Sequence, residues 1–339
     1  MLSTLARFLT LLALLAPCLA GAQTPKTQPL PPNGGDFAPN PTVLNKVPQG
    51  VILVKGAWYS ASDSVTPTPE GGAVDNGVFT DQYFGMSYKL PPEWEEKYKG
   101  PPPSDSGRYV LAQLRPIDSF KGARANVLVT AQDMFFTPLP ANNALELINY
   151  SKNHLQADNK VEMTPSPTKI AGRPFTFFAY WSPIAELHWY VMATEIRCHT
   201  VEMVLSSRDT KLLESLVLDL NRMKMPAEGA PTSPAGDPVC LKDYARDENM
   251  ITRVEPIFSE HRFNSVPVRI IIDKQGNIKH IHFLSAFPDQ EKAITDAMHQ
   301  WKFKPYLQNG KPVEVETGIM FGRQLQRMKS ADGSSATTD

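Results

Sequence analysis

The fold of the C-terminal third of the chain is decided by one stretch, 266-VPVRIIIDKQGNIKHIHFL-284. Val266, Val268, Ile270 and Ile272 alternate with other residues, which is the period-two pattern of a strand with one buried face. Residues 274–277 predict a turn, and residues 278–284 return as a second strand. The stretch therefore predicts an antiparallel β-hairpin.

A helix is predicted directly after this hairpin. Pro288-Asp289 can open it, and we expect the side chain of Asp289 to cap its first turn. The apolar residues recur at helical spacing and predict one stripe packed on the hairpin: Ile294, Ala297, Met298 and Trp301. Pro305 cannot continue a helix, so it ends this one.

The last predicted strand follows the turn at Asn309-Gly310. We expect it to lie at an edge of the small sheet, with backbone groups free to pair with another strand. This predicts a partner-binding site made of Val313, Glu314, Val315, Glu316, Thr317, Ile319 and Phe321. Glu314 and Glu316 would then either select a basic partner segment or protect the edge from aggregation.

Residues of about 253–323 resemble the C-terminal domain of the TonB family. The Gly276 turn, the helix followed by Trp301, Phe303 and Pro305, and the turn at residues 309–313 stand where that family has recurrent residues. The resemblance implies a small ββαβ adaptor domain in the periplasm. It also implies that the last strand pairs with an extended peptide of an envelope protein, for example an outer-membrane transporter. The same fold can instead serve to form a homodimer or to hold a neighbouring domain.

The N-terminus predicts export. Arg7 precedes a short apolar run, Phe8 to Ala16, and Ala20-Gly21-Ala22 is a signal-peptidase pattern, so we expect a mature chain that begins at Gln23. The apolar run is shorter than the roughly 20 residues that span a bilayer, which predicts no stable membrane insertion after cleavage. Energy-transducing TonB proteins keep an N-terminal membrane helix, so a true transducer remains an alternative only if this segment is retained.

Proline-rich stretches divide the rest of the chain. We predict a signal peptide (1–22), a Pro-rich linker (23–50), a larger α+β domain (51–226), a second linker (227–240), the TonB-like domain (241–325) and a disordered tail (326–339).

The larger domain is predicted to be a largely antiparallel sheet with packed helices. Strands are expected at residues 83–90, 109–114, 127–131, 175–181, 187–196 and 200–205. Helices are expected at residues 142–155, capped by Asn142 or Asn143, and after Asp209. This order, together with 83-YFGMSY-88 and 90-LPPEW-94, resembles PsbP-like domains over most of residues 79–225.

No constellation in the chain predicts catalysis, a metal or a cofactor. Ser166 and Lys169 match a Ser-x-x-Lys spacing, but Pro165 and Pro167 oppose the helix that this chemistry needs. His280 and His282 share a strand face, and we expect that face to be exposed rather than metal-bound. The 34 basic and 35 acidic residues nearly cancel, so no excess positive charge favours nucleic acid.

Two cysteines remain after signal cleavage, and an oxidising compartment allows them to pair. A Cys198–Cys240 disulfide would tie the larger domain to the second linker, and two unpaired cysteines are the alternative.

The sequence as a whole predicts a non-enzymatic protein of the periplasm, or a secreted one, that binds a protein or peptide partner by strand addition. The aromatic strand at residues 175–181 leaves a second function open. In that alternative the larger domain is a periplasmic carrier that holds a small apolar ligand on its sheet.

Overall fold

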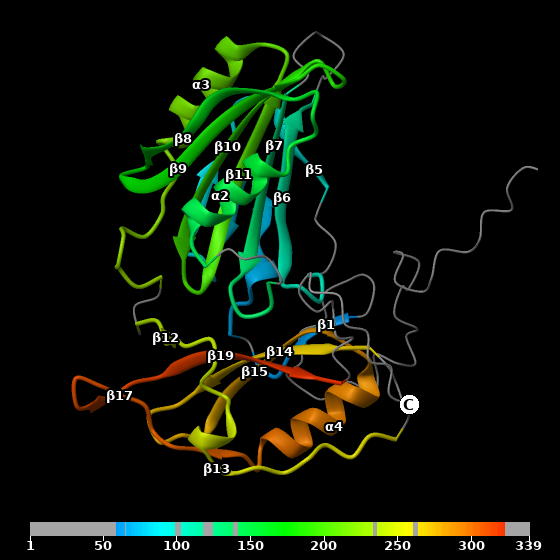
Figure 1. Cartoon of the computed structure of the whole chain (residues 1–339), viewed down its shortest axis with the longest axis vertical. Coiled ribbons are helices and arrows are strands. Elements are labelled where there is room, and N and C mark those ends of the chain that lie inside the picture. Colours follow the sequence, from blue (N-terminus) through cyan, green and yellow to red (C-terminus); the bar gives the residue numbers. More distant parts are fainter. Residues whose placement is uncertain are drawn as a thin grey trace, which may run out of the picture.

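The computed structural model describes residues 59–64, 66–98, 103–117, 125–137, 142–232, 236–259 and 264–322. They form an α+β protein with two sheet-based units, stacked along the long axis in Figure 1. The predicted signal peptide, Pro-rich linker and C-terminal tail lie outside the described residues.

The larger unit is built on a seven-stranded sheet that is antiparallel, as the sequence predicts, but the strand expected at residues 83–90 lies in a separate three-stranded sheet. Its strands, in spatial order, are β5 (Trp94–Tyr98), β6 (Arg108–Pro116), β7 (Ala125–Asp133), β11 (His199–Ser207), β10 (Leu187–Ile196), β9 (Arg173–Ser182) and β8 (Lys160–Ile170).

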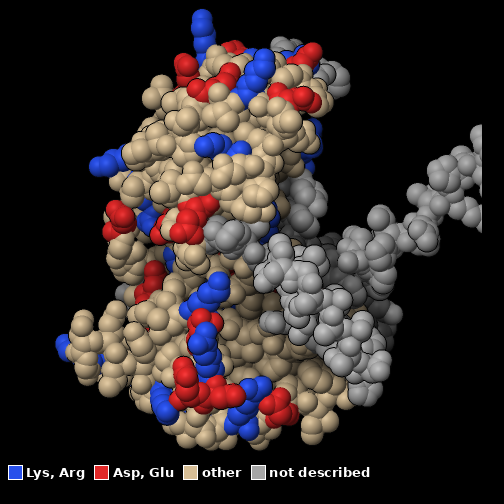
Figure 2. Space-filling model, in the orientation of Figure 1, with Lys and Arg blue, Asp and Glu red and all other residues tan. Residues whose placement is uncertain are grey.

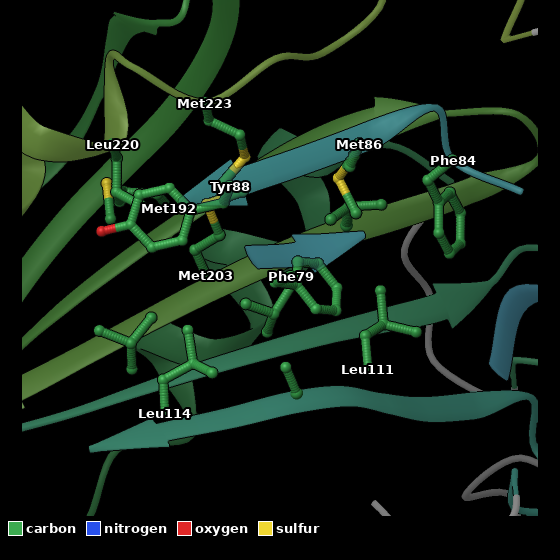
Figure 3. Packing of buried hydrophobic residues seen from close by; sticks show 14 of the residues in the cluster. Phe79, Phe84, Met86, Tyr88, Leu111, Leu114, Met192, Met203, Leu220 and Met223 are labelled. Atoms are coloured by element: carbon green, nitrogen blue, oxygen red, sulfur yellow. The ribbon is translucent and has the colours of Figure 1, made fainter. Parts of the chain in front are cut away.

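One face of this sheet carries the main core. A three-stranded sheet and helix α3 (Thr210–Leu220) cover that face. The strands of the small sheet are β2 (Ala73–Asp75), β3 (Val78–Asp81) and β4 (Met86–Lys89). Figure 3 shows Phe79 and Tyr88 of this small sheet packed over Leu111, Leu114 and Met203. Close packing of large apolar side chains is the main stabilising term for such a domain.

Helix α2 (Ala144–Asn153) covers part of the opposite face. Its N-cap is Asn143, whose side chain accepts a hydrogen bond from the backbone N–H of Glu146 (2.9 Å). Asp209 caps α3 in the same way, by accepting from the N–H groups of Lys211 and Leu212. Both caps agree with the sequence, because short polar side chains satisfy the free N–H groups of a first turn.

Two strands of the large sheet were not predicted. β5 begins at Trp94, where a loop was expected. β8 carries Pro165 and Pro167, which usually argue against a strand. β5 and β8 are the two outermost strands of the sheet. The outer side of an edge strand pairs with no other strand of the sheet, so a proline there removes no hydrogen bond between strands.

The smaller unit is a five-stranded sheet with one helix. Its strands, in spatial order, are β1 (Tyr59–Ser62), β15 (Ile278–Ala286), β14 (Val266–Ile272), β19 (Val315–Phe321) and β12 (Val239–Cys240). Helix α4 (Pro288–Met298) packs on one face, and the remaining short strands are β13 (Met250–Thr252), β16 (Lys302–Phe303), β17 (Leu307–Gln308) and β18 (Lys311–Pro312).

The predicted hairpin is confirmed as β14 and β15. Gly276 in its turn has φ +83°, and a Cβ there would lie 2.0 Å from the carbonyl oxygen of Phe303. Only glycine allows the β16 backbone to approach so closely, and the N–H of Phe303 donates to the carbonyl of Gly276. This contact fixes the return of the chain after α4.

Three features of this unit correct the sequence-based expectations. Phe287, not Asp289, is the N-cap residue of α4. Residues 59–62, which the prediction assigned to the larger domain, pair with β15. The strand predicted to be outermost, β19, has β12 beyond it at Val315 and Glu316. β1 and β12 both come from segments far away in the sequence. A local sequence pattern does not indicate that such a segment joins the sheet.

None of the helices in the described part of the chain is long and apolar enough to cross a membrane. On the face shown in Figure 2, acidic and basic side chains are interspersed over both units.

Candidate functional site

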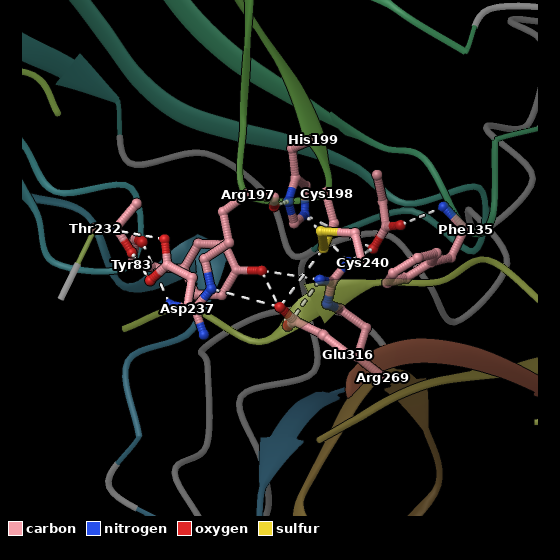
Figure 4. The surroundings of a disulfide bond; sticks show 11 residues. Tyr83, Phe135, Arg197, Cys198, His199, Thr232, Asp237, Cys240, Arg269 and Glu316 are labelled. Atoms are coloured by element: carbon pink, nitrogen blue, oxygen red, sulfur yellow. Dashed lines mark hydrogen bonds and ion pairs between the residues drawn. A yellow bond between two sulfur atoms is a disulfide. The ribbon is translucent and has the colours of Figure 1, made fainter. Parts of the chain in front are cut away.

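The two units meet through a buried cluster of charged side chains centred on Arg269 (Figure 4). Arg269 lies in β14 between Val268 and Ile270, so its side chain leaves the sheet on the face opposite α4. It is only 2% exposed. An arginine so placed must have its charge paired, because burial of an unpaired charge is very costly.

Arg269 is paired from both units. Its guanidinium forms an ion pair with Asp133, at the end of β7 in the larger unit. A second ion pair joins Nη2 to Oε1 of Glu316 in β19 (2.8 Å), and the same Nη2 donates to the hydroxyl of Tyr83 (2.8 Å). The cluster therefore joins the smaller unit to the larger one through charge-assisted hydrogen bonds, which are among the stronger kinds.

Glu316 is held by a second arginine. Nε of Arg197 lies 3.4 Å from its Oε2, and the Arg197 guanidinium stacks 4.0 Å above the ring of Tyr83. Burial alone would raise the pKa of Glu316, but Arg269 and Arg197 outweigh it and lower that pKa to about 2. Glu316 is thus ionised at neutral pH, and its two carboxylate oxygens are used within the interface.

His199 lies in the same cluster but carries no charge. Burial and the nearby Arg269 lower the pKa of His199 well below its usual range. Its Nδ1 lies 2.7 Å from the carbonyl oxygen of Arg197, which places the ring proton on that nitrogen. Nε2 is then an acceptor, so its 3.7 Å separation from the Asp133 carboxylate is not an ion pair.

The pKa of Asp133 shifts in the opposite direction to that of Glu316. Burial raises the pKa of Asp133, and Arg269 offsets only part of that effect. Its carboxylate also accepts a hydrogen bond from the N–H of Phe135 (2.7 Å). Asp133 is the last residue of β7, and these contacts allow its carboxylate to lie inside the interface instead of in water.

A disulfide closes the cluster on one side. Cys198 and Cys240 are bonded, with their Cα atoms 5.5 Å apart, so the predicted pairing is present. Cys198 lies in the two-residue turn between β10 and β11, and Cys240 lies in β12. The bond therefore links the larger unit to the strand that covers part of β19 (Figure 4).

The two units also touch at Gly318 of β19. A Cβ at this position would lie 2.6 Å from the Cβ of Phe135 and 2.9 Å from the ring of Phe136. These phenylalanines follow β7, so they cover the face of the smaller sheet directly beside the charged cluster. Only a residue without a side chain permits this approach.

The two histidines of β15 are buried, which corrects the prediction of an exposed face. His280 lies 2.7 Å from the carboxylate of Asp63, and Nε2 of His282 lies 2.7 Å from Oε1 of Glu70. Ser60 of β1 contacts both His282 and Glu70. Serine and carboxylate meet the same ring nitrogen here, so the histidine cannot relay a proton between them as it does in a catalytic triad.

Each of these histidines pairs with a carboxylate from a different position in the chain. Within the residues that the structure describes, no group of three or more His, Cys, Asp or Glu side chains is placed to hold a metal ion. Asp63 and Glu70, from the described residues 59–64 and 66–71, each pair with one of these histidines on this face of the sheet.

The aromatic strand β9 divides between two cores, as predicted for a two-sided sheet. Phe175 and Phe177 face the main core, whereas Phe178 and Tyr180 lie on the α2 face. A hollow of about 300 Å³ lies elsewhere, between Arg173, Arg197 and the linker at residues 229–232. Its lining mixes the charged residues Arg173, Arg197 and Asp237 with apolar and small ones, and it is not on the aromatic face of the sheet.

The family of the smaller unit follows from its sequence. Residues 262–322 match the family model described as the Gram-negative bacterial TonB protein C-terminal. Residues 262–322, which form most of the smaller unit, are a TonB-type C-terminal domain. No curated protein matches the chain. The solution structure of cyanobacterial PsbP from Synechocystis sp. PCC 6803 is similar at 14% identity and a TM-score of 0.32, over 45% of this chain and 96% of that one.

The predicted partner-binding residues of the TonB-type domain have unequal environments. Val315, Thr317 and Phe321 are buried toward α4, and Ile319 is partly buried there. Glu316 is buried in the interface, which contradicts its predicted role as an exposed charge. Val313 and Glu314 are half-buried, and Glu314 pairs with Lys279. Partner binding at this strand stays a prediction.

Sequence reasoning missed the residues of the interface. Asp133 and Tyr83 lie 136 and 186 positions before Arg269 in the sequence, and no motif links the three residues. One signal was available: Arg269 interrupts an otherwise apolar run, and a charge within a strand buried on both faces requires a partner.

Proposed function

We propose that this chain is a non-enzymatic cell-envelope protein whose TonB-type domain binds an extended segment of a protein or peptide partner by strand addition at β19. The match of residues 262–322 to the TonB family supports an envelope location. The observation that carries the mechanism is the direction of the β19 backbone groups.

The register of the sheet sets that direction. Pro267, which has no N–H, lies opposite Met320, so this pair cannot exchange the two hydrogen bonds of a bonded antiparallel pair. Bonded and non-bonded pairs alternate, and therefore Glu316, Gly318 and Met320 direct their backbone groups away from β14. The carbonyl of Glu316 accepts from the N–H of Leu241 in agreement with this assignment (3.0 Å).

β12 uses only the first part of this outer side. Its paired residues reach Glu316, and among the described residues no strand pairs with the outer side of β19 at Gly318 or Met320. These two residues offer backbone donors and acceptors of the kind that an added strand uses.

The other face of the domain is already occupied. Arg269, Glu316 and Gly318 face the larger unit, and His280 and His282 face Asp63 and Glu70. A partner that approached this face would have to break buried ion pairs, which is strongly unfavourable. Strand addition needs no such cost, so we place partner binding at the edge.

The partner class follows from the family. We propose a protein or peptide of the envelope, such as an outer-membrane transporter, met by a periplasmic chain that begins at Gln23. Recovery of the protein in the periplasmic fraction with that N-terminus tests the location. Recovery only in the membrane fraction with Met1 intact would overturn it and favour a membrane-anchored transducer.

A proline substitution tests the edge. Met320→Pro removes one outward backbone donor, whereas Met320→Ala shortens the side chain and keeps that donor. Ile319→Pro removes an N–H that faces β14 and serves as the control for damage to the sheet. Glu316 and Thr317 are unsuitable, because one holds the interface and the other faces β14.

The readout is chemical cross-linking to proteins of an envelope extract, followed by mass spectrometry. The proposal expects a partner that is captured by the parent chain and by Met320→Ala and is lost with Met320→Pro, while all three unfold at similar urea concentrations. Capture of the same partners by Met320→Pro would contradict strand addition at this edge.

A further inference from the structure

Strand β12 occupies part of the outer edge of β19. The N–H of Val239 donates to the carbonyl of Glu314 (2.8 Å), and the N–H of Leu241 donates to the carbonyl of Glu316 (3.0 Å). The two strands run parallel. β12 therefore makes the same kind of contact that an incoming peptide would make at this edge.

β12 contributes little to its own position. It is two residues long, Val239 is half-buried, and Cys240 is exposed. So short a strand fixes the chain with few contacts, and such segments open easily unless another bond holds them. Leu241 beside it packs against the core of the smaller unit, and the one covalent bond that holds β12 in place is the disulfide between Cys240 and Cys198.

The turn that carries Cys198 is built to stay in place. Arg197 and Cys198 both have positive φ, 42° and 58°, in a two-residue turn where glycine or asparagine is usual. Strained turns persist only where the surroundings hold them, and here Arg197 is held by Glu316 and by the ring of Tyr83. Cys198 is therefore a rigid anchor, and β12 is the movable end of the bond.

The two cysteine residues differ in exposure. Cys198 is 6% exposed, whereas Cys240 is an exposed residue. A thiolate from solvent can reach Cys240 first, because the attacking sulfur must approach its target directly. Accessible disulfides of this kind are the ones that dithiol proteins reduce.

We propose that Cys198–Cys240 is a redox latch, and that its reduction releases β12 so that a partner strand can take its place at Glu314 and Glu316. The inference rests on the proposed strand addition at β19 and names the segment that competes with the partner. The partner is an extended segment with two backbone N–H groups spaced two residues apart, as in Val239 and Leu241.

The reductant is a dithiol protein of the envelope. One of its thiolates attacks Cys240, the Cys198–Cys240 bond breaks, and Cys198 leaves and takes up a proton. The second thiol of the reductant then displaces Cys240, which also becomes a thiol. Two electrons and two protons move to this chain, and the reductant is left as a disulfide.

Hydrogen exchange on the full chain tests the latch without any partner. Mild reduction should speed exchange at the amides of Val239 and Leu241 roughly tenfold or more, because only β12 is released. The amides of Ile270 and Thr317, inside the β14–β19 ladder, should keep their rates. No change at β12, or equal acceleration at all four amides, would overturn the latch.

Two variants guard against an effect of the reductant elsewhere. Cys240→Ser and Cys198→Ser each remove the bond and leave a different thiol. Both should show the exchange pattern of the reduced protein in the absence of reductant. A variant that exchanges at β12 as slowly as the oxidised parent chain would also overturn the latch.

A peptide of residues 236–244 with serine in place of Cys240 then probes the vacated edge. It should bind the reduced chain and Cys240→Ser at least about tenfold more tightly than the oxidised chain. The same peptide with Leu241→Pro lacks one donor and should not bind. Released β12 without peptide binding would overturn strand addition at this edge but support the latch, so the two proposals fail separately.

Discussion

The two faces of the sheet in the TonB-type domain are made from the same strands but held by different forces. Toward α4 the strands present apolar side chains, among them Val268, Ile270 and Phe283. Toward the larger unit they present Arg269 and Glu316, both nearly inaccessible to water. Burial of each large apolar side chain stabilises the fold by about 1.5–3 kcal/mol without regard to direction. A buried ion pair contributes only when its partners lie in place.

The difference assigns separate tasks to the faces. The apolar face stabilises the domain itself, whereas the charged face joins the domain to the larger unit, because Arg269 pairs there with Asp133 and Tyr83. This docking covers the face, and among the described residues it leaves the outer side of β19 at Gly318 and Met320 without a paired strand. The contrast predicts that a substitution on the charged face lowers the free energy of unfolding most when it leaves a buried charge without its partner.

Arg269→Ala should therefore have the largest effect. It leaves Asp133 buried without its cation and Glu316 with Arg197 alone, and removal of one partner of a buried pair costs about 3–5 kcal/mol. Urea unfolding of the parent chain and the variant measures the loss. The double variant Arg269→Met with Asp133→Leu should lose less stability than Arg269→Ala, because it leaves fewer unpaired buried charges.

A cost for Arg269→Ala below about 1 kcal/mol would show that water reaches the cluster, and that the charged face resembles an ordinary surface.

The pH dependence of stability sharpens the same contrast. The folded pKa of Glu316 is lowered to about 2, so its contribution is fully present above its unfolded pKa near 4.5 and is lost as the pH falls toward 2. At about 1.4 kcal/mol per pKa unit this is about 3 kcal/mol at most. Asp133 acts in the opposite sense, because its raised pKa favours its protonated form in the folded state.

Glu316→Gln should flatten the fall in stability between pH 4.5 and 2, measured by urea unfolding at a series of pH values. Arg269, Arg197 and neutral His199 also face this carboxylate and stay as they are in the variant. An unchanged pH profile would assign the acid sensitivity to another carboxylate.

The contact at Gly318 should have a smaller effect. Gly318→Ala places a methyl group 2.6 Å from the Cβ of Phe135, and overpacking of this kind costs about 1–3 kcal/mol. Gly71→Ala is the matched control, since the nearest atom to its new methyl group would be 3.8 Å away. If thermal unfolding shifts equally for both, the two units do not meet tightly at Gly318.

The contrast between the faces also explains what the sequence could predict. Alternation along residues 266–284 identifies β14 and β15 because it reports which side chains share a face. It does not report what covers that face, so His280 and His282 were expected in solvent but lie under β1 and Glu70. The caps Asn143 and Asp209 were predictable because their contacts lie within three residues.

The interface was not predictable for the same reason. Asp133, Glu316 and Tyr83 meet Arg269 only after both units have folded. β12 likewise lacks a local signal, because two residues have no period. The disulfide could be proposed only because few cysteines were available. The structure shows that β12, which carries Cys240, pairs with β19.

The smallest expected effect comes from the nearest comparison, two glutamates two positions apart on β19. Glu314 pairs with Lys279 at 2.8 Å, as closely as Glu316 pairs with Arg269, but the Lys279 and Glu314 side chains are 55% and 28% exposed. Water and salt screen such a pair, so a double-mutant cycle with Glu314→Gln and Lys279→Met should give a coupling of about 0.2–1 kcal/mol. The coupling should fall further in 1 M salt, where the screening length is about 3 Å. Equal coupling energies for the Glu314–Lys279 and Glu316–Arg269 pairs would mean that burial does not distinguish the two pairs. The assignment of different roles to the two faces would then be wrong.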